Sequence, residues 1–155
     1  MNLVFLDTEF TNFNNPELIS IGLASSDSAN FYAEVDYVAS SCSEFVHKVV
    51  VPLLSCNSQI STEHLRDKIL RWFDSIRGTS PIVICYDSDY DRILFLRLFD
   101  NNLPNFLILR SIGYRHINGV KRADFYLSNN LDEHHALNDA MALRYAFRGW
   151  TRTVR

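Results

Sequence analysis

Three short stretches of the sequence combine carboxylates, in one case with a histidine, at spacings suited to metal binding. Asp7 and Glu9 lie two residues apart in FLDTEFT, directly after a short apolar run. If this run is a β-strand, residues two apart point to the same face, so the two side chains are neighbours. Neighbouring carboxylates repel unless they are protonated or share a cation such as Mg²⁺, which prefers oxygen ligands. For this pair alone, two surface acids at a strand end remain the simpler explanation.

The second stretch, YDSDYDRILF at residues 86–95, places acids at positions 87, 89 and 91, where a strand is expected to run into a helix. Asp89 is suited to cap the helix, and Asp91 then lies in its first turn, where the helix dipole favours an acid. Capping does not explain Asp87. The three acids together therefore indicate a cation.

The third stretch is HHALNDAMAL at residues 134–143. Its apolar residues fit a helix packed on a core, but such packing does not explain His134 or Asp139. If the helix begins near His135, Asp139 lies just over one turn into it and His134 lies at or before its start. The two side chains can then meet at one site, although either one alone fits an ordinary surface position.

The elements that position these residues follow from hydrophobic periodicity. Strands are predicted at residues 3–6, 18–24, 30–35, 81–86 and 106–109, and helices at residues 43–54, 62–76, 89–99 and 135–150. Residues 113–130 are predicted to be irregular and polar. The first three strands form an antiparallel meander, whereas a strand followed by a crossover helix implies parallel pairing. The sequence therefore predicts an α/β fold with a central mixed sheet flanked by helices.

Length and composition restrict the class of protein. The 155 residues, with 47% hydrophobic and 21% charged content, fit one globular domain over residues 1–155. No apolar run approaches the roughly 20 residues of a membrane span. The chain start also lacks the basic segment of a signal peptide, so we expect a soluble, cytoplasmic protein. Cys42, Cys56 and Cys85 form no CxxC pair, which predicts reduced core thiols.

The charged residues are unevenly distributed. Residues 1–100 contain 14 Asp and Glu against 7 Lys and Arg, whereas residues 101–155 contain 8 Lys and Arg against 4 Asp and Glu. The acidic part is consistent with cation binding. The basic part could face an anionic substrate or form an ordinary solvated surface.

Taken together, the three stretches occur in the order, and on the strand pattern, of the DEDDh 3′-to-5′ exonucleases, which the chain resembles from residue 3 to about residue 147. The first motif is DTEFT at residues 7–11, the second is centred on Asp91, and the third has the spacing H-x-A-x-x-D from His134 to Asp139. DTEF followed by ELISIG at residues 17–22 is most similar to small stand-alone bacterial exoribonucleases. The resemblance implies a ribonuclease H-like fold and 3′-to-5′ hydrolysis of single-stranded RNA, with single-stranded DNA as the alternative.

The resemblance also implies a role for each site residue. Asp7 would bridge two Mg²⁺ or Mn²⁺ ions, Glu9 and Asp139 would hold the ion with the attacking water, and Asp91 would support the second ion. His134 would deprotonate the water. Stand-alone members are frequently homodimers, so a homodimer is expected. The predicted substrate contacts are Phe10, Thr11, Tyr86, Asp87 and Arg115.

Some positions depart from the family pattern. The pair Tyr86-Asp87 stands where the family often has His-Asn, so Asp87 either replaces an amide contact or adds a metal contact. Asp89 competes with Asp91 as a ligand, and spacing favours Asp91. His135 is expected to face solvent.

Two other functions compete with the exonuclease interpretation. A haloacid-dehalogenase-like phosphatase also ends its first strand with acids, in the motif D-x-D-x-T, but here the second acid is Glu9. A non-catalytic module that binds nucleic acid is the other alternative.

Overall fold

The centre of the molecule is a five-stranded mixed sheet with the order β3-β2-β1-β4-β5. The structure is a computed structural model and describes residues 2–55 and 59–150. The central strand β1 (Asn2–Phe10) pairs antiparallel with β2 (Leu18–Ser25), which pairs antiparallel with β3 (Asn30–Glu34). On its other side β1 pairs parallel with β4 (Ile82–Tyr86), which pairs parallel with β5 (Leu107–Ser111). The predicted meander with added parallel strands is confirmed.

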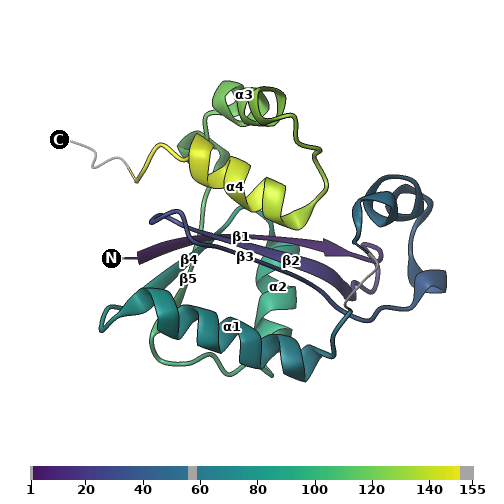
Figure 1. Ribbon diagram of the computed structural model, residues 1–155, viewed down its shortest axis with the longest axis horizontal. Helices are drawn as coiled ribbons and strands as arrows, with labels where there is room; N and C mark the ends of the chain where they lie inside the picture. Colours follow the sequence, from purple (N-terminus) through teal and green to yellow (C-terminus); the bar gives the residue numbers. More distant parts are fainter. Residues whose placement is uncertain (1, 56–58, 151–155) are drawn as a thin grey trace.

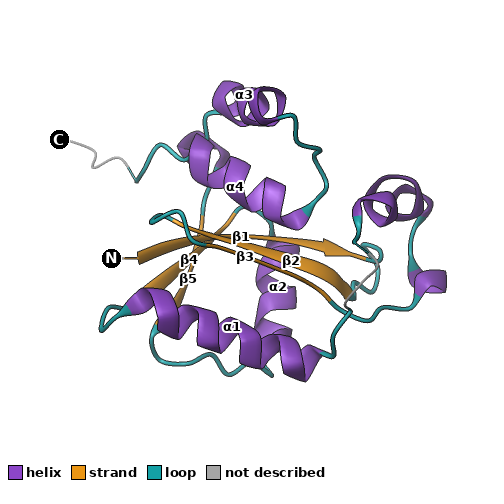
Figure 2. Cartoon of the chain, viewed as in Figure 1, coloured by secondary structure: helices purple, strands orange, loops and turns teal. Residues whose placement is uncertain are grey.

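The described part of the chain contains four α-helices, which pack on the sheet or on one another (Figures 1 and 2). They are α1 (Thr62–Arg77), α2 (Asp89–Leu98), α3 (Gly119–Asn129) and α4 (Ala136–Ala146). Figure 1 shows α1 on one side of the sheet and α4 on the other, with α3 packed beyond α4. Within residues 2–55 and 59–150, no helix is long and apolar enough to cross a membrane.

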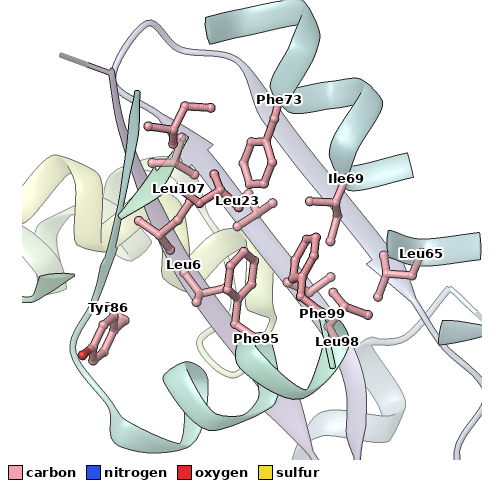
Figure 3. Packing of buried hydrophobic residues seen from close by; sticks show 14 of the residues in the cluster. Leu6, Leu23, Leu65, Ile69, Phe73, Tyr86, Phe95, Leu98, Phe99 and Leu107 are labelled. Carbon is pink, nitrogen blue, oxygen red and sulfur yellow. The ribbon is translucent and has the colours of Figure 1, made fainter. Parts of the chain in front are cut away.

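The larger apolar core lies between the sheet and helices α1 and α2 (Figure 3). Leu65, Ile69 and Phe73 recur every four residues on α1, so they share one face, and all three are fully buried. The oxygen of Ser61 caps this helix by accepting a hydrogen bond from a backbone N–H of its first turn, and Gly78 ends it with a φ of 56°. These boundaries agree with the sequence prediction.

Strand β1 presents different residues to its two faces. Val4 and Leu6 belong to the core under α1 and α2, whereas Phe5 packs in a smaller cluster with residues of α4. Because side chains alternate along a strand, Asp7 and Glu9 continue the face of Phe5, under α4. One strand thus supplies an apolar face and an acidic face.

Gly22 of β2 allows α4 to approach the sheet closely. A Cβ atom at this position would lie 2.2 Å from the backbone oxygen of Ala136, the first residue of α4. No side chain fits at that distance without moving the helix. Gly22 is also the register partner of Asp7, so the beginning of α4 is held against the strand that carries the acids.

Two segments differ from the sequence prediction in the type of element. Residues 43–54 do not form a regular α-helix, because a π-helical turn, η2 (Val46–Val50), runs into the 3₁₀ turn η3 (Val51–Leu53). Pro52 in η3 lacks the N–H that an α-helix would need there. Residues 113–130 are not irregular throughout, since they contain α3, which is capped by the side chain of Asn118.

Other differences concern boundaries. Strand β1 continues to Phe10, beyond the predicted residue 6, because residues 7–10 still pair with β2. Helix α4 ends at Ala146 rather than residue 150, since Phe147 has an extended backbone and forms a β-bridge with Ile117. Cys85 is buried and Cys42 is partly exposed, both as free thiols, whereas Cys56 lies outside the described residues.

Candidate metal centre

The acids of the three sequence stretches meet at the C-terminal end of β1. Strands β1 and β4 are parallel, so their C-terminal ends lie at the same edge of the sheet, and the start of α4 packs over this edge. The site residues form two groups, which we name the histidine group and the aspartate group. In each group the potential ligand atoms lie within 4.8 Å of one another: Glu9, His134 and Asp139 in the histidine group, and Asp7, Asp87 and Asp91 in the aspartate group.

Asp91 is the most buried of these acids, with 2% of its surface exposed. Ser88 caps α2 by accepting a hydrogen bond from the N–H of Tyr90, which leaves Asp91 in the first turn. Its Oδ1 accepts hydrogen bonds from the backbone N–H of Thr8 (3.0 Å) and from the Thr8 hydroxyl (2.7 Å). Its buried Oδ2 has no hydrogen-bond partner among the described residues. A buried oxygen without a partner is costly, so its place in the aspartate group fits a cation.

Asp139 and His134 are fixed relative to each other at the start of α4. Both oxygens of Asp139 accept hydrogen bonds, Oδ1 from the hydroxyl of Tyr126 (2.8 Å) and Oδ2 from the backbone N–H of His134 (3.1 Å). His134 has a φ of 62°, a left-handed conformation that costs a residue other than glycine about 1–2 kcal/mol. Its ring meets the ring of Phe45 edge-on, with centroids 5.1 Å apart. The hydrogen bond from the His134 backbone to Asp139 and the ring contact with Phe45 together hold the imidazole beside the carboxylates.

Burial and mutual repulsion raise the pKa values of the acids. Burial, together with the charges of Asp139 and Asp91, raises the pKa of Glu9 to about 8. Burial raises the pKa of Asp91 to about 7, against the effect of the hydrogen bonds from Thr8. The pKa of Asp7 is well above its usual range, through burial and the neighbouring acids, and burial also raises the pKa of Asp139. A bound divalent cation would reverse these shifts, which is the electrostatic pattern of a metal site.

A pocket of about 490 Å³ opens over these groups. Its lining combines carboxylates and His134 with aromatic and aliphatic side chains. The ring of Phe10 stacks on Tyr90 at a centroid distance of 5.0 Å, and Phe13 meets both rings edge-on. The apolar lining is formed by Phe10, Phe13, Phe45, Val46 and Val50, the last two from the π-helical turn η2.

The structure brings together the five residues to which the sequence assigned catalytic roles: Asp7, Glu9, Asp91, His134 and Asp139. Of the predicted substrate contacts, Phe10 lines the pocket and Asp87 belongs to the aspartate group. Thr11 is fully buried and holds the loop after β1 through hydrogen bonds. Tyr86 is 8% exposed and packs in the core under α1 and α2, and Arg115 lies on an exposed 3₁₀ turn. The structure therefore does not place Thr11, Tyr86 or Arg115 in the pocket lining.

Two expectations based on spacing were wrong. Asp89 does not cap α2, because Ser88 does, and Asp89 instead forms an exposed ion pair with Arg92 at 3.2 Å. His135 does not face solvent freely. It precedes α4 and is partly buried, with its ring stacked on Tyr32 at a centroid distance of 4.4 Å.

Three contributors to the site were not predicted from the sequence. Thr8 lies between the first two acids but points to the opposite face, where it holds Asp91. Phe45 and Tyr126 lie in the two segments whose structure differs from the prediction. Asn118 is a residue type that often caps helices, and it was the available sequence signal for α3. This helix carries Tyr126, eight residues after the cap, toward the site.

No protein-family model matches the chain, and no curated protein sequence matches it. Solved structures do match. One of them, the structure of S. pombe Pop2p in its Mg²⁺- and Mn²⁺-bound form, is similar with a TM-score of 0.59 over 92% of this chain and 79% of that chain, at 13% sequence identity. At this identity the likeness concerns the fold, and it agrees with the strand order and helix placement described above. The chain therefore has a ribonuclease H-like α/β fold.

Proposed function

We propose that the protein is a metal-dependent 3′-to-5′ exoribonuclease, which hydrolyses single-stranded RNA from its 3′ end and releases nucleoside 5′-monophosphates. One observation carries the proposal. Two groups of potential ligand atoms, one of them with a histidine, meet at the end of β1, and Asp7, Glu9, Asp91, His134 and Asp139 of these groups line one pocket. Two-metal hydrolysis of a phosphodiester needs this combination of oxygen ligands and a nearby base.

The side chains fit two Mg²⁺ or Mn²⁺ ions. Carboxylate oxygens are the ligands that these ions prefer, and the unpartnered Oδ2 of Asp91 offers one of them. Glu9 and Asp139 would hold one ion and Asp91 the other, with Asp7 in contact with both. When bound, such a pair of ions activates water and stabilises the leaving oxygen during phosphoryl displacement.

His134 is the base in this proposal. One of its ring nitrogens lies within 4.8 Å of carboxylate oxygens of Glu9 and Asp139, so the imidazole would border the water held by an ion at this group. Imidazole is suited to accept a proton near neutral pH. The bond from the His134 backbone to Asp139 fixes the position of the base relative to the carboxylates.

The shape of the pocket supports a terminal, single-stranded nucleotide as the substrate. A volume of about 490 Å³ is in the range of small-ligand pockets, and the exposed residues Phe13 and Phe45 belong to the lining together with the acids. A base stacked on these rings leaves its phosphate toward the carboxylates. RNA rather than DNA, and a homodimer, are proposed because the sequence motifs resemble those of stand-alone exoribonucleases.

The proposal is tested with RNA and DNA strands of one sequence, each labelled at the 5′ end and incubated with Mg²⁺, Mn²⁺ or EDTA. Asp7→Asn and His134→Asn should abolish cleavage, and asparagine is chosen at 134 because it tolerates a left-handed backbone. Asp89→Asn and His64→Asn, at exposed positions outside the pocket, are the matched controls and should remain active.

A ladder that shortens from the 3′ end with metal, faster for RNA than for DNA, is the expected result. Phosphate release from a monoester without strand shortening would replace the proposal with a phosphatase. Binding of 3′ ends without turnover would replace it with a non-catalytic binding module. Sedimentation analysis of the same protein tests the homodimer.

A further inference from the structure

Helix α3 supplies one side chain to each of the two acidic groups. The hydroxyl of Tyr126 donates a hydrogen bond to Oδ1 of Asp139 in the histidine group, at 2.8 Å. Nη1 of Arg122 donates to Oδ2 of Asp87 in the aspartate group, also at 2.8 Å. Arg122 and Tyr126 are four residues apart, so they share one face of α3. This face of α3 therefore contacts both groups.

The tyrosine contact orients Asp139. Tyr126 is 7% exposed, and its hydroxyl is directed at the carboxylate. Because the backbone N–H of His134 donates to the other oxygen, both oxygens of Asp139 are held in position.

The arginine contact fixes Asp87. Among the ion pairs of the described residues, Arg122–Asp87 is the one that includes a member of the two groups. Burial by itself would lower the pKa of Arg122, but the charge of Asp87 outweighs it and the pKa is raised, so the guanidinium stays cationic. The carboxylate of Asp87 is thus held with its oxygens near those of Asp7 and Asp91.

We propose that Asp87 is a fifth carboxylate ligand of the metal centre, and that Arg122 and Tyr126 are positioning residues that hold Asp87 and Asp139 for the two ions. This inference rests on the proposed function. An independent observation supports a cation at the aspartate group, namely the buried and unpartnered Oδ2 of Asp91. Charge balance agrees as well, because Arg122 and two divalent ions together neutralise five carboxylates.

The test is a calorimetric titration of the metal-free protein with Mn²⁺, without nucleic acid. Tyr126→Phe and Arg122→Met should each weaken Mn²⁺ binding by about 10–100-fold, the usual cost of losing a contact that supports a metal ligand. Asp87→Asn removes a proposed ligand and should weaken Mn²⁺ binding at least as much. Tyr145→Phe, on the neighbouring helix α4, and Arg66→Met, from the surface pair with Asp100, are the matched controls and should bind as the wild type does.

A double variant separates metal binding from folding. Arg122→Met leaves Asp87 unpaired and should lower stability, and adding Asp87→Asn should restore stability without restoring Mn²⁺ affinity. Unchanged Mn²⁺ affinity in folded Tyr126→Phe and Arg122→Met proteins would overturn the inference while leaving the proposed function intact. A wild-type protein that binds no Mn²⁺ would instead defeat the proposed function.

Discussion

On one face of the sheet, β1 packs Val4 and Leu6 against the apolar side chains of α1 and α2, whereas on the other face Phe5 is followed by Asp7 and Glu9. Complete burial of each large apolar side chain contributes about 1.5–3 kcal/mol on the first face. On the second face, burial works against the fold, because it raises the pKa values of the acids. The comparison shows that the apolar face stabilises the fold, whereas burial of the acids on the other face opposes it.

The largest expected effect is that of a substitution on the acidic face, which should lower the cleavage activity and raise the stability of the metal-free protein. Asp7→Asn should reduce cleavage by about 10³-fold, because several kcal/mol of transition-state stabilisation are lost with the metal ligand. The same change should increase the free energy of unfolding of the metal-free protein at pH 8, since the charge repelled by the neighbouring acids is removed. Cleavage rates and urea unfolding measure the two effects, and a lower metal-free stability would contradict the comparison.

A substitution on the apolar face should lower stability and leave the cleavage rate of the folded protein unchanged. Phe73 is fully buried in the core under α1, and Phe73→Ala should lower the free energy of unfolding by about 3–5 kcal/mol. The rate per folded molecule should stay the same, because Phe73 does not line the pocket. Urea unfolding gives the first quantity, and cleavage rates corrected for the folded fraction give the second. Leu127→Ala, at an exposed position, serves as the control and should change stability little.

The acids also predict how metal-free stability depends on pH. The pKa of Glu9 is raised from 4.5 to about 8 and that of Asp91 from 3.8 to about 7. Between the ordinary and the raised values the folded protein retains protons that the unfolded chain has released, so stability should fall as pH rises from about 4 to 8. We expect a loss of several kcal/mol, because a pKa difference of one between the folded and unfolded states corresponds to about 1.4 kcal/mol. Melting temperatures in EDTA check this, and Mn²⁺ should raise them more at pH 8 than at pH 5.5.

The smallest expected effect concerns the apolar wall of the pocket. Phe13 is 69% exposed, so Phe13→Ala should change stability little. It should raise the KM for single-stranded RNA by about 5–10-fold, at the low end of the roughly 1–3 kcal/mol for one base stacked on an aromatic ring. Tyr114→Ala removes an exposed ring that does not line this pocket and is the control. Equal KM values for both variants would exclude stacking on Phe13.

The parts of the molecule with strong periodicity were predictable from the sequence. The alternation of β1 placed Asp7 and Glu9 on one face, and the spacing in α1 identified its buried stripe. Helix α3 was not predictable in this way, because Tyr126 is its one buried residue, while Val120 and Leu127 are exposed. A helix held mainly by polar contacts leaves no apolar stripe in the sequence.

The substrate side of the pocket was harder to predict for a different reason. The pairing of β1 with β2 shifts register between Glu9 and Phe10. Such a bulge reorients the residues that follow, which is why Phe10 reaches the pocket and Thr11 is buried instead. Likewise, the spacing of the valines in η2 fits a regular α-helix, but these residues form a π-helical turn, which is wider than an α-helical turn.

Gly22 has a consequence for how related chains can be recognised. A chain could keep all five of the site residues named above and still not form this site, if a side chain opposite the first aspartate pushed away the helix that carries the histidine and the last aspartate. Glycine at this position is therefore a sixth requirement of the sequence motif, although it carries no functional group. Sequence searches that require this glycine would separate chains able to form the site from chains that only contain its acids and histidine.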